Sequence, residues 1–442
     1  MRSMLLMLSL IAAPAFAAEN ETDVSNPQAI ADLEARRRTD ANAAWWGFDQ
    51  DDATDAVQAA IDSGAKTVTI PNVGQDWIVR PLTLAGDQEL ILEEGVVIAA
   101  KRGEYRGRGD SVFTARDIDN LTIRGDGATV RMQKEDYISG LVLKDLGWNR
   151  WYGQYEKAEW RMCLSLRGCN NVLVEGLTLR DSGGDGIYID GGRRMHYSSN
   201  IRLRNVVCDN NYRQGISVIG VDGLLIEDSR FCNTWGTPPS SGIDIEPDAP
   251  THRVKDVEVR NCVFEDNYGD GIEIFLAHLN QDSEPVSILF EDCRVSSRRG
   301  SGIRVTKLAD DGPRGEIVFR NCVVEDTEAY GIKLQDKSVD AAGVKFIDCH
   351  VRNTANDPNY ADAWAPVIFR ARPDSKTKRY GGIEFVNCVV EDDRDRPALK
   401  LPDVDQVFDL TGRISVKNPH SAGSSVEQAP PGCELTVHSV QK

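Results

Sequence analysis

Hydrophobic and polar residues alternate with a period of two along most of the chain from about residue 170. Residues 200–206 (Asn-Ile-Arg-Leu-Arg-Asn-Val) and 257–260 (Val-Glu-Val-Arg) show the pattern, and Gly or Asn stands at the ends of such segments. Alternation of this kind predicts β-strands with one buried face. Helical spacing is not sustained anywhere in this half, which argues against strands that alternate with helices.

Two columns of residues recur with a spacing close to 29 residues. In the first column Gly precedes Ile, and the successive spacings are 29, 27, 29, 31 and 29 residues, at Gly186, Gly215, Gly242, Gly271, Gly302 and Gly331. In the second column Asn or Asp precedes Cys, and the spacings are 31, 29, 27 and 39 residues, at Cys262, Cys293, Cys322, Cys349 and Cys388. Short strands stacked at a fixed repeat predict a β-solenoid, in which each coil buries its apolar face against the next. We therefore predict an all-β fold with one continuous core.

The first part of the chain follows the same plan less regularly. Strand patterns occupy residues 67–70, 90–92, 96–98 and 121–124. Residues 51–61 have the pattern of an amphipathic helix, with acidic residues in the first turn and Gly64 beyond the end. Such a helix would cap the open end of the solenoid. The expected organisation is a signal peptide, an N-terminal segment with the capping helix, a parallel β-helix domain and a C-terminal cap or tail, at residues 1–18, 19–66, 67–412 and 413–442.

The N-terminus has the pattern of a secretory signal peptide. Arg2 precedes an apolar run at residues 4–13, and Ala-Phe-Ala-Ala follows at residues 15–18. A basic start, a short hydrophobic stretch and small residues at the cleavage site are typical of exported proteins. The run is too short to span a bilayer, and no later segment is long enough. We expect a secreted or periplasmic protein without a membrane partner.

Charge restricts the expected binding partners, and cysteine content bears on disulfides and metal sites. The 442 residues carry 69 Asp and Glu against 51 Lys and Arg, a net charge of -18. Such a surface repels phosphate backbones, so we expect no nucleic-acid partner. Five of the ten cysteines lie in one column and are expected to stack inward as free thiols, whereas Cys163 and Cys169 are the best candidates for a disulfide. The absence of a Cys-x-x-Cys pair argues against a zinc site. We also expect the protein to be a monomer.

The helix at 51–61, the Gly-Asp-Gly-Ile-Tyr-Ile segment at 184–189 and the Asn-Cys-Val steps resemble the pectate-lyase-like right-handed parallel β-helix superfamily. The resemblance covers roughly residues 45–410. It implies a right-handed parallel β-helix, and carbohydrate as the ligand. The superfamily includes glycoside hydrolases, polysaccharide lyases, epimerases and non-catalytic tailspike-like proteins. The four-part hydrolase signature of polygalacturonases (Asn-Thr-Asp, Asp-Asp, Gly-His-Gly, Arg-Ile-Lys) and the Tyr-Gly-x-Asp-Pro-His motif of alginate epimerases are absent. Neither specific activity is therefore carried over.

One outer face of the predicted solenoid carries an acidic centre and a basic end. Side chains alternate across a strand, so the Ile after each column Gly points inward and the next residue points outward. The outward positions on successive coils are Tyr188, Ser217, Asp244, Glu273, Arg304 and Lys333. The corner residues Asp185 and Asp270 directly precede two of the column glycines, and Glu246 lies two residues beyond Asp244.

This acidic centre predicts a glycoside hydrolase. Asp244, Glu246, Asp270 and Glu273 would lie on two adjacent coils. When two carboxyl groups are this close, the pKa of one rises, which supplies the acid and the base that glycosidic cleavage needs. We expect Asp244 and Glu273 to be the leading pair in an exposed groove, with Glu246 and Asp270 as close substitutes.

The substrate expected from this reasoning is a polysaccharide or an oligosaccharide. Aromatic faces stack on sugar rings, and Arg213 could clamp a hydroxyl or a carboxylate. The candidate substrate-binding residues are Asp185, Tyr188, Arg213, Trp235, Arg304 and Lys333.

Two alternatives remain open at this point. In a polysaccharide lyase, Glu246, Asp244 and Asp270 would hold Ca²⁺ through oxygen ligands, and Arg304 or Lys333 would remove the C5 proton of a uronate. A non-catalytic carbohydrate-binding solenoid would need the aromatic segments at 148–160 and 233–239 but not the clustered acids. The hydrolase itself is expected to need no metal or cofactor.

Overall fold

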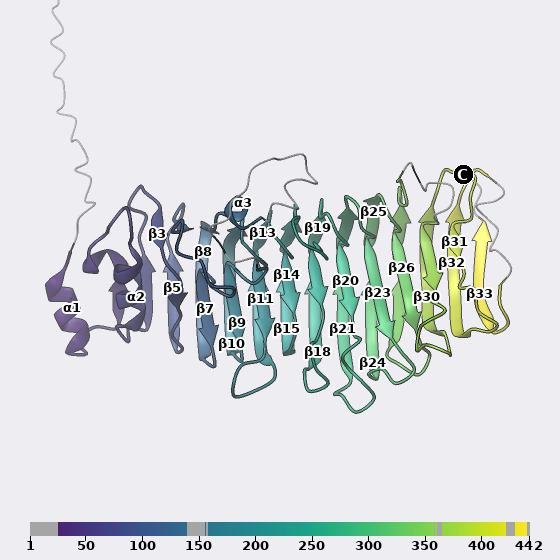
Figure 1. Ribbon diagram of the computed structural model, residues 1–442, viewed down its shortest axis with the longest axis horizontal. Coiled ribbons are helices and arrows are strands. Elements are labelled where there is room, and N and C mark those ends of the chain that lie inside the picture. Colours follow the sequence, from purple (N-terminus) through teal and green to yellow (C-terminus); the bar gives the residue numbers. More distant parts are fainter. Residues whose placement is uncertain are drawn as a thin grey trace, which may run out of the picture.

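A computed structural model describes residues 25–138, 155, 158–357, 359, 365–420 and 429–439. The predicted signal peptide lies outside these residues. Short strands wind around one axis and stack along it from the purple to the yellow end of the chain (Figure 1). Neighbouring coils pair in parallel, and each full coil contributes three strands. In the described part of the chain, no helix is both long and apolar enough to cross a membrane.

The strands form three columns along the axis. The first column contains β1 Asp40–Asn42, β2 Thr67–Ile70, β5 Gln88–Leu92, β8 Asp119–Arg131, β10 Asn170–Arg180, β12 Ser198–Arg204, β15 Val221–Glu227, β18 Val254–Arg260, β21 Val286–Glu291, β24 Gly315–Arg320, β27 Gly343–Ile347, β30 Gly381–Glu391, β32 Phe408–Lys417 and β33 Cys433–Ser439. The second column contains the ends of β8, β10 and β30 together with β3 Trp77–Val79, β6 Val97–Ala100, β13 Val207–Asp209, β16 Arg230–Cys232, β19 Val263–Glu265, β22 Arg294–Ser297, β25 Val323–Thr327 and β28 His350–Arg352. The third column contains β4 Leu82–Thr83, β7 Phe113–Arg116, β9 Leu164–Arg167, β11 Ile187–Asp190, β14 Ile216–Val218, β17 Ile243–Ile245, β20 Ile272–Phe275, β23 Ile303–Leu308, β26 Ile332–Lys337, β29 Val367–Arg370 and β31 Leu399–Lys400.

Helical segments precede or interrupt the strands at α1 Pro27–Glu34, η1 Ala43–Trp46, α2 Thr54–Asp62 and α3 Lys134–Tyr137. The helix predicted at 51–61 is α2, which begins three residues later than expected. Its Val57, Ala60 and Ile61 are fully buried in the same core as the strands, and the helix lies at the N-terminal end of the stack (Figure 1). The sequence patterns did not predict α1, a short helix that the Asn26 side chain caps.

The column of glycines marks a corner at which two coils approach each other closely. The amide of Ile216 donates a hydrogen bond of 3.0 Å to the carbonyl of Gly242 on the next coil. A Cβ atom on the preceding Gly215 would lie 2.4 Å from that carbonyl oxygen, nearer than any real Cβ contact. The corner therefore requires glycine for lack of space, which explains why the residue recurs once per coil.

Replacing Gly215 by Ala is expected to destabilise the protein by about 2 kcal/mol or more, because backbone must move to admit the methyl group. Gly343 in β27 is the matched control, since nothing lies within 4 Å of a Cβ built there. Gly343→Ala should be neutral or stabilising by up to about 1 kcal/mol. Thermal unfolding followed by circular dichroism measures both. Equal melting temperatures for the two variants would contradict this account of the column.

The column of cysteines found in the sequence is an inward stack of thiols, as predicted. Cys262, Cys293 and Cys322 are at most 2% exposed, and all ten cysteines are free. The residue before each column cysteine has a positive φ of 50–56°, a backbone region that Asn and Asp tolerate better than other non-glycine residues. The predicted disulfide is wrong, because the Cys163 thiol bonds the Arg180 carbonyl while the Cys169 thiol bonds the Arg167 carbonyl.

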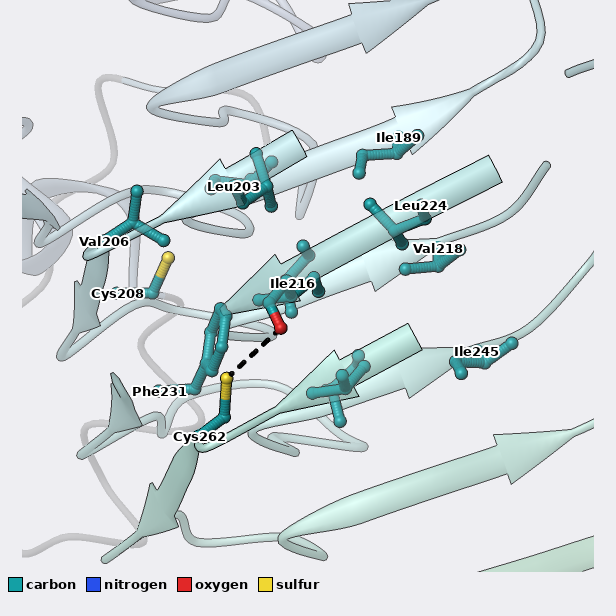
Figure 2. Packing of buried hydrophobic residues seen from close by; sticks show 14 of the residues in the cluster. Ile189, Leu203, Val206, Cys208, Ile216, Val218, Leu224, Phe231, Ile245 and Cys262 are labelled. Atoms are coloured by element: carbon teal, nitrogen blue, oxygen red, sulfur yellow. Dashed lines mark hydrogen bonds between the residues drawn. The ribbon is translucent and has the colours of Figure 1, made fainter. Parts of the chain in front are cut away.

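The interior of the solenoid is filled mainly by aliphatic, aromatic and thiol side chains. Figure 2 shows residues of adjacent coils lying one above another, and the Cys262 thiol bonding a backbone carbonyl, that of Ile226, at 3.7 Å. Further along the axis, the rings of Phe290, Phe319 and Phe346 stack with centroids 5.3 and 4.8 Å apart. Each coil thus completes the core of its neighbour, as expected for a solenoid.

The sheet extends beyond the predicted C-terminal boundary. Residue 412 falls inside β32, and β33 pairs in parallel with β32. The Gly-Ile and Asn-Cys columns end before these strands do, which is why the repeat alone placed the end of the solenoid too early.

Candidate active site

The predicted outward column is present in register on the third column of strands. Ser217 of β14 pairs with Asp244 of β17, Asp244 pairs with Glu273 of β20, and Glu273 pairs with Arg304 of β23. Tyr188 and Lys333 continue the column at its two ends. The roughly 29-residue repeat is therefore one winding, and residues far apart in the sequence become neighbours about 4.8 Å apart.

The expectation that these acids line an exposed groove is wrong. Asp244, Asp270 and Glu273 are only 1%, 5% and 4% exposed. They point away from the solenoid core. Side chains of the neighbouring coils nevertheless flank each of them, and residues at the corners of the coils bond to them. Glu246 is the most accessible of the four predicted catalytic residues, with 28% of its side chain exposed.

Asp244 is held by a fixed amide and keeps one oxygen free. The amide of Ser241 donates to Oε1 of Gln214 at 2.6 Å, which orients the Gln214 side chain so that Nε2 donates to Oδ2 of Asp244 at 2.8 Å. Oδ1 of Asp244 has no hydrogen-bond partner among the described residues. Burial and the carboxylates of Glu273 and Glu246 raise the pKa of Asp244 well above its usual range. The direction of this shift favours the protonated form of Asp244, and Oδ1 is the oxygen that remains available for a proton because Oδ2 already accepts a hydrogen bond.

Glu273 and Asp270 share Arg304. The guanidinium lies 3.1 Å from both Oδ2 of Asp270 and Oε1 of Glu273. The Ser241 hydroxyl also donates to Oε2 of Glu273, at 3.1 Å. Burial, reinforced by the carboxylate of Asp270 and opposed by Arg304, raises the pKa of Glu273 to about 7. Both oxygens of Glu273 are thus engaged, in contrast to Oδ1 of Asp244.

The raised pKa of Glu273 predicts a loss of stability as the pH rises. The pKa increases from 4.5 in the unfolded chain to about 7 in the folded protein. Between these values the folded protein retains a proton that the unfolded chain has lost, so the free energy of unfolding falls, by roughly 3 kcal/mol for an isolated group. Glu273→Gln should remove this part of the decline. Denaturant titrations at pH 4.5 and pH 7 measure it, with the exposed Glu316→Gln as control; parallel declines in wild type and Glu273→Gln would refute the prediction.

Arg213 lies at the centre of a second group of acids. Its guanidinium is 3.8 Å from Asp185, 3.8 Å from Glu246 and 4.0 Å from Glu159, so charge rather than hydrogen bonding holds it. Burial raises the pKa of Asp185 to about 6, with Arg213 opposing the shift. Both carboxyl oxygens of Asp185 and Oγ of Ser217 are buried without a hydrogen bond of good geometry among the described residues. The Ser217 hydroxyl and the Gln214 backbone nevertheless lie close enough to Asp185 to lower the pKa of its carboxyl group, so these contacts are weak rather than absent. Buried polar atoms that are poorly paired in this way could be completed by a polar ligand.

The aromatic candidates contribute less than predicted. Tyr188 is buried, with the Arg167 guanidinium 4.5 Å from its ring centre. The half-buried ring of Trp235 has Lys134 at 4.0 Å, so stacking a sugar on that side would require Lys134 to move. Trp148 and Trp151 lie outside the described residues.

A small cleft adjoins the Arg213 group. It has a volume of about 200 Å³ and is lined by Arg108, Ala158, Glu159, Trp160, Tyr212 and Thr237. Trp160 is one of the more exposed large apolar side chains, at 36%. The Arg108 guanidinium lies 5.0 Å from the centre of the Trp160 ring, and Glu159 connects the cleft to Arg213.

The calcium site of the lyase alternative does not fit this arrangement. In the described ranges, no three His, Cys, Asp or Glu side chains are placed to hold a metal ion. Asp270 already binds Arg304, and Glu246 faces Arg213 at 3.8 Å, so cationic side chains lie where the ion would be needed. In this arrangement Asp244, Glu246 and Asp270 are engaged by Gln214, Arg213 and Arg304 rather than grouped around a common point.

Sequence reasoning missed the polar residues that hold the acids. Gln214 and Ser241 occupy the same corner position as Asp185 and Asp270, directly before a column glycine. From the sequence, only the acidic residues at this corner position are treated as candidates. Gln214 and Ser241 could have been identified from the column of glycines, because each directly precedes one of them.

The family model described as "Right handed beta helix region" matches residues 157–284 and 286–367. The A-module of the mannuronan C-5 epimerase AlgE6 of Azotobacter vinelandii superposes with a TM-score of 0.65 at 15% identity, covering 90% of this chain and 99% of that chain. The fold is a right-handed parallel β-helix. Its sequence-predicted class is thereby confirmed.

Two further similarities are more distant or partial. Tailspike protein gp49 of the Acinetobacter baumannii bacteriophage Fri1, a capsular polysaccharide depolymerase, shares the β-helix with a TM-score of 0.51 at 12% identity, over 82% of this chain and 60% of that chain. The uncharacterized protein YclG of Bacillus subtilis (strain 168) is 24% identical over 267 residues. This match covers 53% of the present chain and 43% of YclG, so the chain spans less than half of that relative.

Proposed function

We propose that this β-helix protein is an exported glycoside hydrolase that cleaves a polysaccharide at Asp244 and Glu246. The observation that carries the proposal is the buried Asp244, whose Oδ1 has no hydrogen-bond partner among the described residues and whose pKa is raised in part by the more accessible carboxylate of Glu246. The similar β-helix proteins include an epimerase of mannuronan and a depolymerase of capsular polysaccharide, which supports a carbohydrate substrate.

Asp244 acts as the general acid in this proposal. Cleavage requires a proton on the leaving glycosidic oxygen, and an acid whose pKa lies near or above the working pH supplies it. Gln214 occupies Oδ2, so the proton is available on Oδ1. Donation leaves a carboxylate that the Gln214 amide continues to stabilise, and a water molecule later restores the proton.

Glu246 supplies the second carboxylate. It lies two residues along the strand direction from Asp244 and therefore on the same side of the wall, with backbones roughly 6.6 Å apart. Glu246 either attacks the anomeric carbon directly or activates a water molecule that attacks this carbon, as in the two classes of glycosidase. Glu273 helps to raise the pKa of Asp244, and Glu273 and Asp270 together hold Arg304, so they position the centre without contacting the bond that breaks.

Arg213 controls access to the acid. Asp244 is 1% exposed, so a substrate must displace a neighbouring side chain to reach Oδ1. Among the described residues, the Arg213 guanidinium lies 3.8–4.0 Å from three carboxyl groups, which is longer than the 3.1 Å contacts of Arg304, so Arg213 is held less tightly. A sugar hydroxyl that bonds Arg213 and the free oxygens of Asp185 would draw the guanidinium away from Asp244 and satisfy the unpaired atoms together.

A panel of neutral, uronic-acid and sulfated glycans tests the proposed activity. Wild-type protein is incubated with each glycan, with and without a chelator, and new reducing ends are quantified together with the ultraviolet absorbance of an unsaturated uronate. The hydrolase should release reducing ends without absorbance and without sensitivity to the chelator. Reducing ends accompanied by absorbance would overturn hydrolysis in favour of elimination, and no product from any glycan would overturn the enzymatic proposal.

A polysaccharide lyase that uses Lys333 as the base is the second candidate. Burial and the cation of Arg304 lower the pKa of Lys333, which favours the neutral amine that could remove a proton. No acidic side chain in the described part of the chain forms an ion pair with it. If the products carry the unsaturated absorbance, Lys333→Met should abolish their formation.

A further inference from the structure

A larger cleft lies on the same wall, toward the C-terminal end from the acidic centre. Its volume is about 800 Å³, and residues of β29, β31 and the loop that follows β31 form much of it. The lining includes Tyr330, Ile368, Arg370, Lys400, Leu401 and Phe408. The reaction described above does not use this cleft.

Cations that form no ion pair among the described residues reach the cleft in steps of one coil. Lys333 pairs with Ile368 of the next coil, which pairs with Lys400 of the coil beyond, and Arg370 lies two residues after Ile368. At about 4.8 Å per coil, the steps from Arg304 to Lys400 span roughly 14 Å along the axis. The cations therefore form a track that begins next to the acidic centre.

The track gathers cations on a chain that is acidic as a whole. In the described residues Lys333, Arg370 and Lys400 form no ion pair, although the chain carries a net charge of -18. By contrast, Arg304 binds two carboxylates and Arg372 binds Asp336 at 2.7 Å. Burial and the cations of Arg304 and Arg370 lower the pKa of Lys333, and the carboxylates of Asp270 and Glu273 offset this only in part, so the cations repel one another. A bound anion would relieve that repulsion.

The rest of the lining suits a sugar ring with an acidic substituent. Ile368, only 7% exposed, and Leu401 give the cleft an apolar base. Tyr330 and Phe408 also line it, with the Lys333 ammonium 5.7 Å from the centre of the Tyr330 ring and the Arg379 guanidinium 4.8 Å from that of Phe408. Asp403 and Asp405 are exposed on the loop after β31 and would contact hydroxyl groups rather than carboxylates. Apolar faces with a few charged groups are typical of glycan-binding clefts.

We propose that this cleft binds the acidic sugars, uronate or sulfated, of an anionic polysaccharide whose scissile bond lies at Asp244 and Glu246. Arg370 and Lys400 would bind carboxylate or sulfate oxygens, and Lys333 would bind the acidic group nearest the centre. The substrate thus lies along the solenoid axis, with its acidic sugars on the C-terminal side of the bond that breaks. This assignment rests on the proposed function for the direction of the chain, but binding in the cleft is measurable without catalysis.

Binding of defined oligosaccharides to the full chain tests the cleft. The protein carries Asp244→Asn so that no substrate is consumed, and calorimetry is performed with oligogalacturonate, with heparin oligosaccharides, with neutral cello-oligosaccharides and with duplex DNA. One acidic oligosaccharide should bind, and Arg370→Gln combined with Lys400→Gln should weaken it by about tenfold or more, as expected for two lost charge-assisted contacts. The control is Arg202→Gln, an exposed residue of β12 that forms no ion pair within the described ranges and lies on another column of strands; it should leave binding unchanged.

The outcomes test binding in the cleft independently of the proposed cleavage at Asp244 and Glu246. Preference for oligogalacturonate or for heparin identifies the acidic group as carboxylate or sulfate. If acidic oligosaccharides bind through Arg370 and Lys400 but wild-type protein cleaves nothing, the cleft assignment stands and the proposed function fails. Binding that the double variant does not weaken, preference for the neutral oligosaccharide, or equally tight binding of DNA would each overturn the cleft assignment.

Discussion

Asp244→Asn is expected to reduce kcat by about 10²–10⁴-fold, the usual contribution of a general acid, while the protein stays folded. The amide mimics the neutral acid in shape: its oxygen can still accept from Gln214, and its NH₂ group takes the place of the protonated Oδ1. It cannot release a proton to the leaving oxygen. Initial rates on the glycan identified by the panel, together with the melting temperature, measure both effects.

Two companion variants make this test specific. Glu316→Gln removes a carboxylate that pairs with Lys345 on another column of strands, and should leave the rate unchanged. Glu246→Gln should lose activity as Asp244→Asn does, because no carboxylate would remain within reach of the anomeric centre. Full activity in Asp244→Asn combined with its loss in Glu273→Gln would move the acid to Glu273. Full activity in all three site variants would contradict the proposed centre altogether.

Ile226→Asp is expected to lower the free energy of unfolding by at least about 4 kcal/mol, enough to prevent folding in a marginally stable coil. Ile226 in β15 is fully buried and pairs with Val259 of β18. An aspartate there would place a carboxyl group inside the hydrophobic core, where the described neighbours offer no polar partner. Near-ultraviolet circular dichroism and the denaturant midpoint report the loss of packing.

The adjacent residue of the same strand provides the matched control. Leu225 is partly exposed and lies between Arg202 and Glu258 of the neighbouring coils. Leu225→Asp makes the same chemical change one residue away, but on the outer face and beside a cation, and should shift stability by less than about 1 kcal/mol. If both variants lose equal stability, the assignment of inner and outer faces in this column is incorrect.

The repeat in the sequence determined the fold and the register of the site. Gly215 and its equivalents recur because the corner has no room for a Cβ atom, and Asn or Asp recurs before each column cysteine because the backbone φ there is positive. Both requirements act locally and once per coil, so they leave a period that can be counted. That period placed Asp244 beside Glu273 and Glu273 beside Arg304, all of which the strand pairing confirms.

Only the tertiary structure decided how each of these side chains is used. Alternation along a strand states which way Asp244 points, but its burial depends on the coils above and below and on corner residues such as Gln214. The free oxygen of Asp244, the engagement of Glu273 by Arg304 and Ser241, and the placement of Lys134 against Trp235 all arise from contacts between segments far apart in the chain. Such contacts leave no repeating pattern of residues in the sequence. Each of them occurs once and depends on side-chain geometry rather than on the repeated backbone.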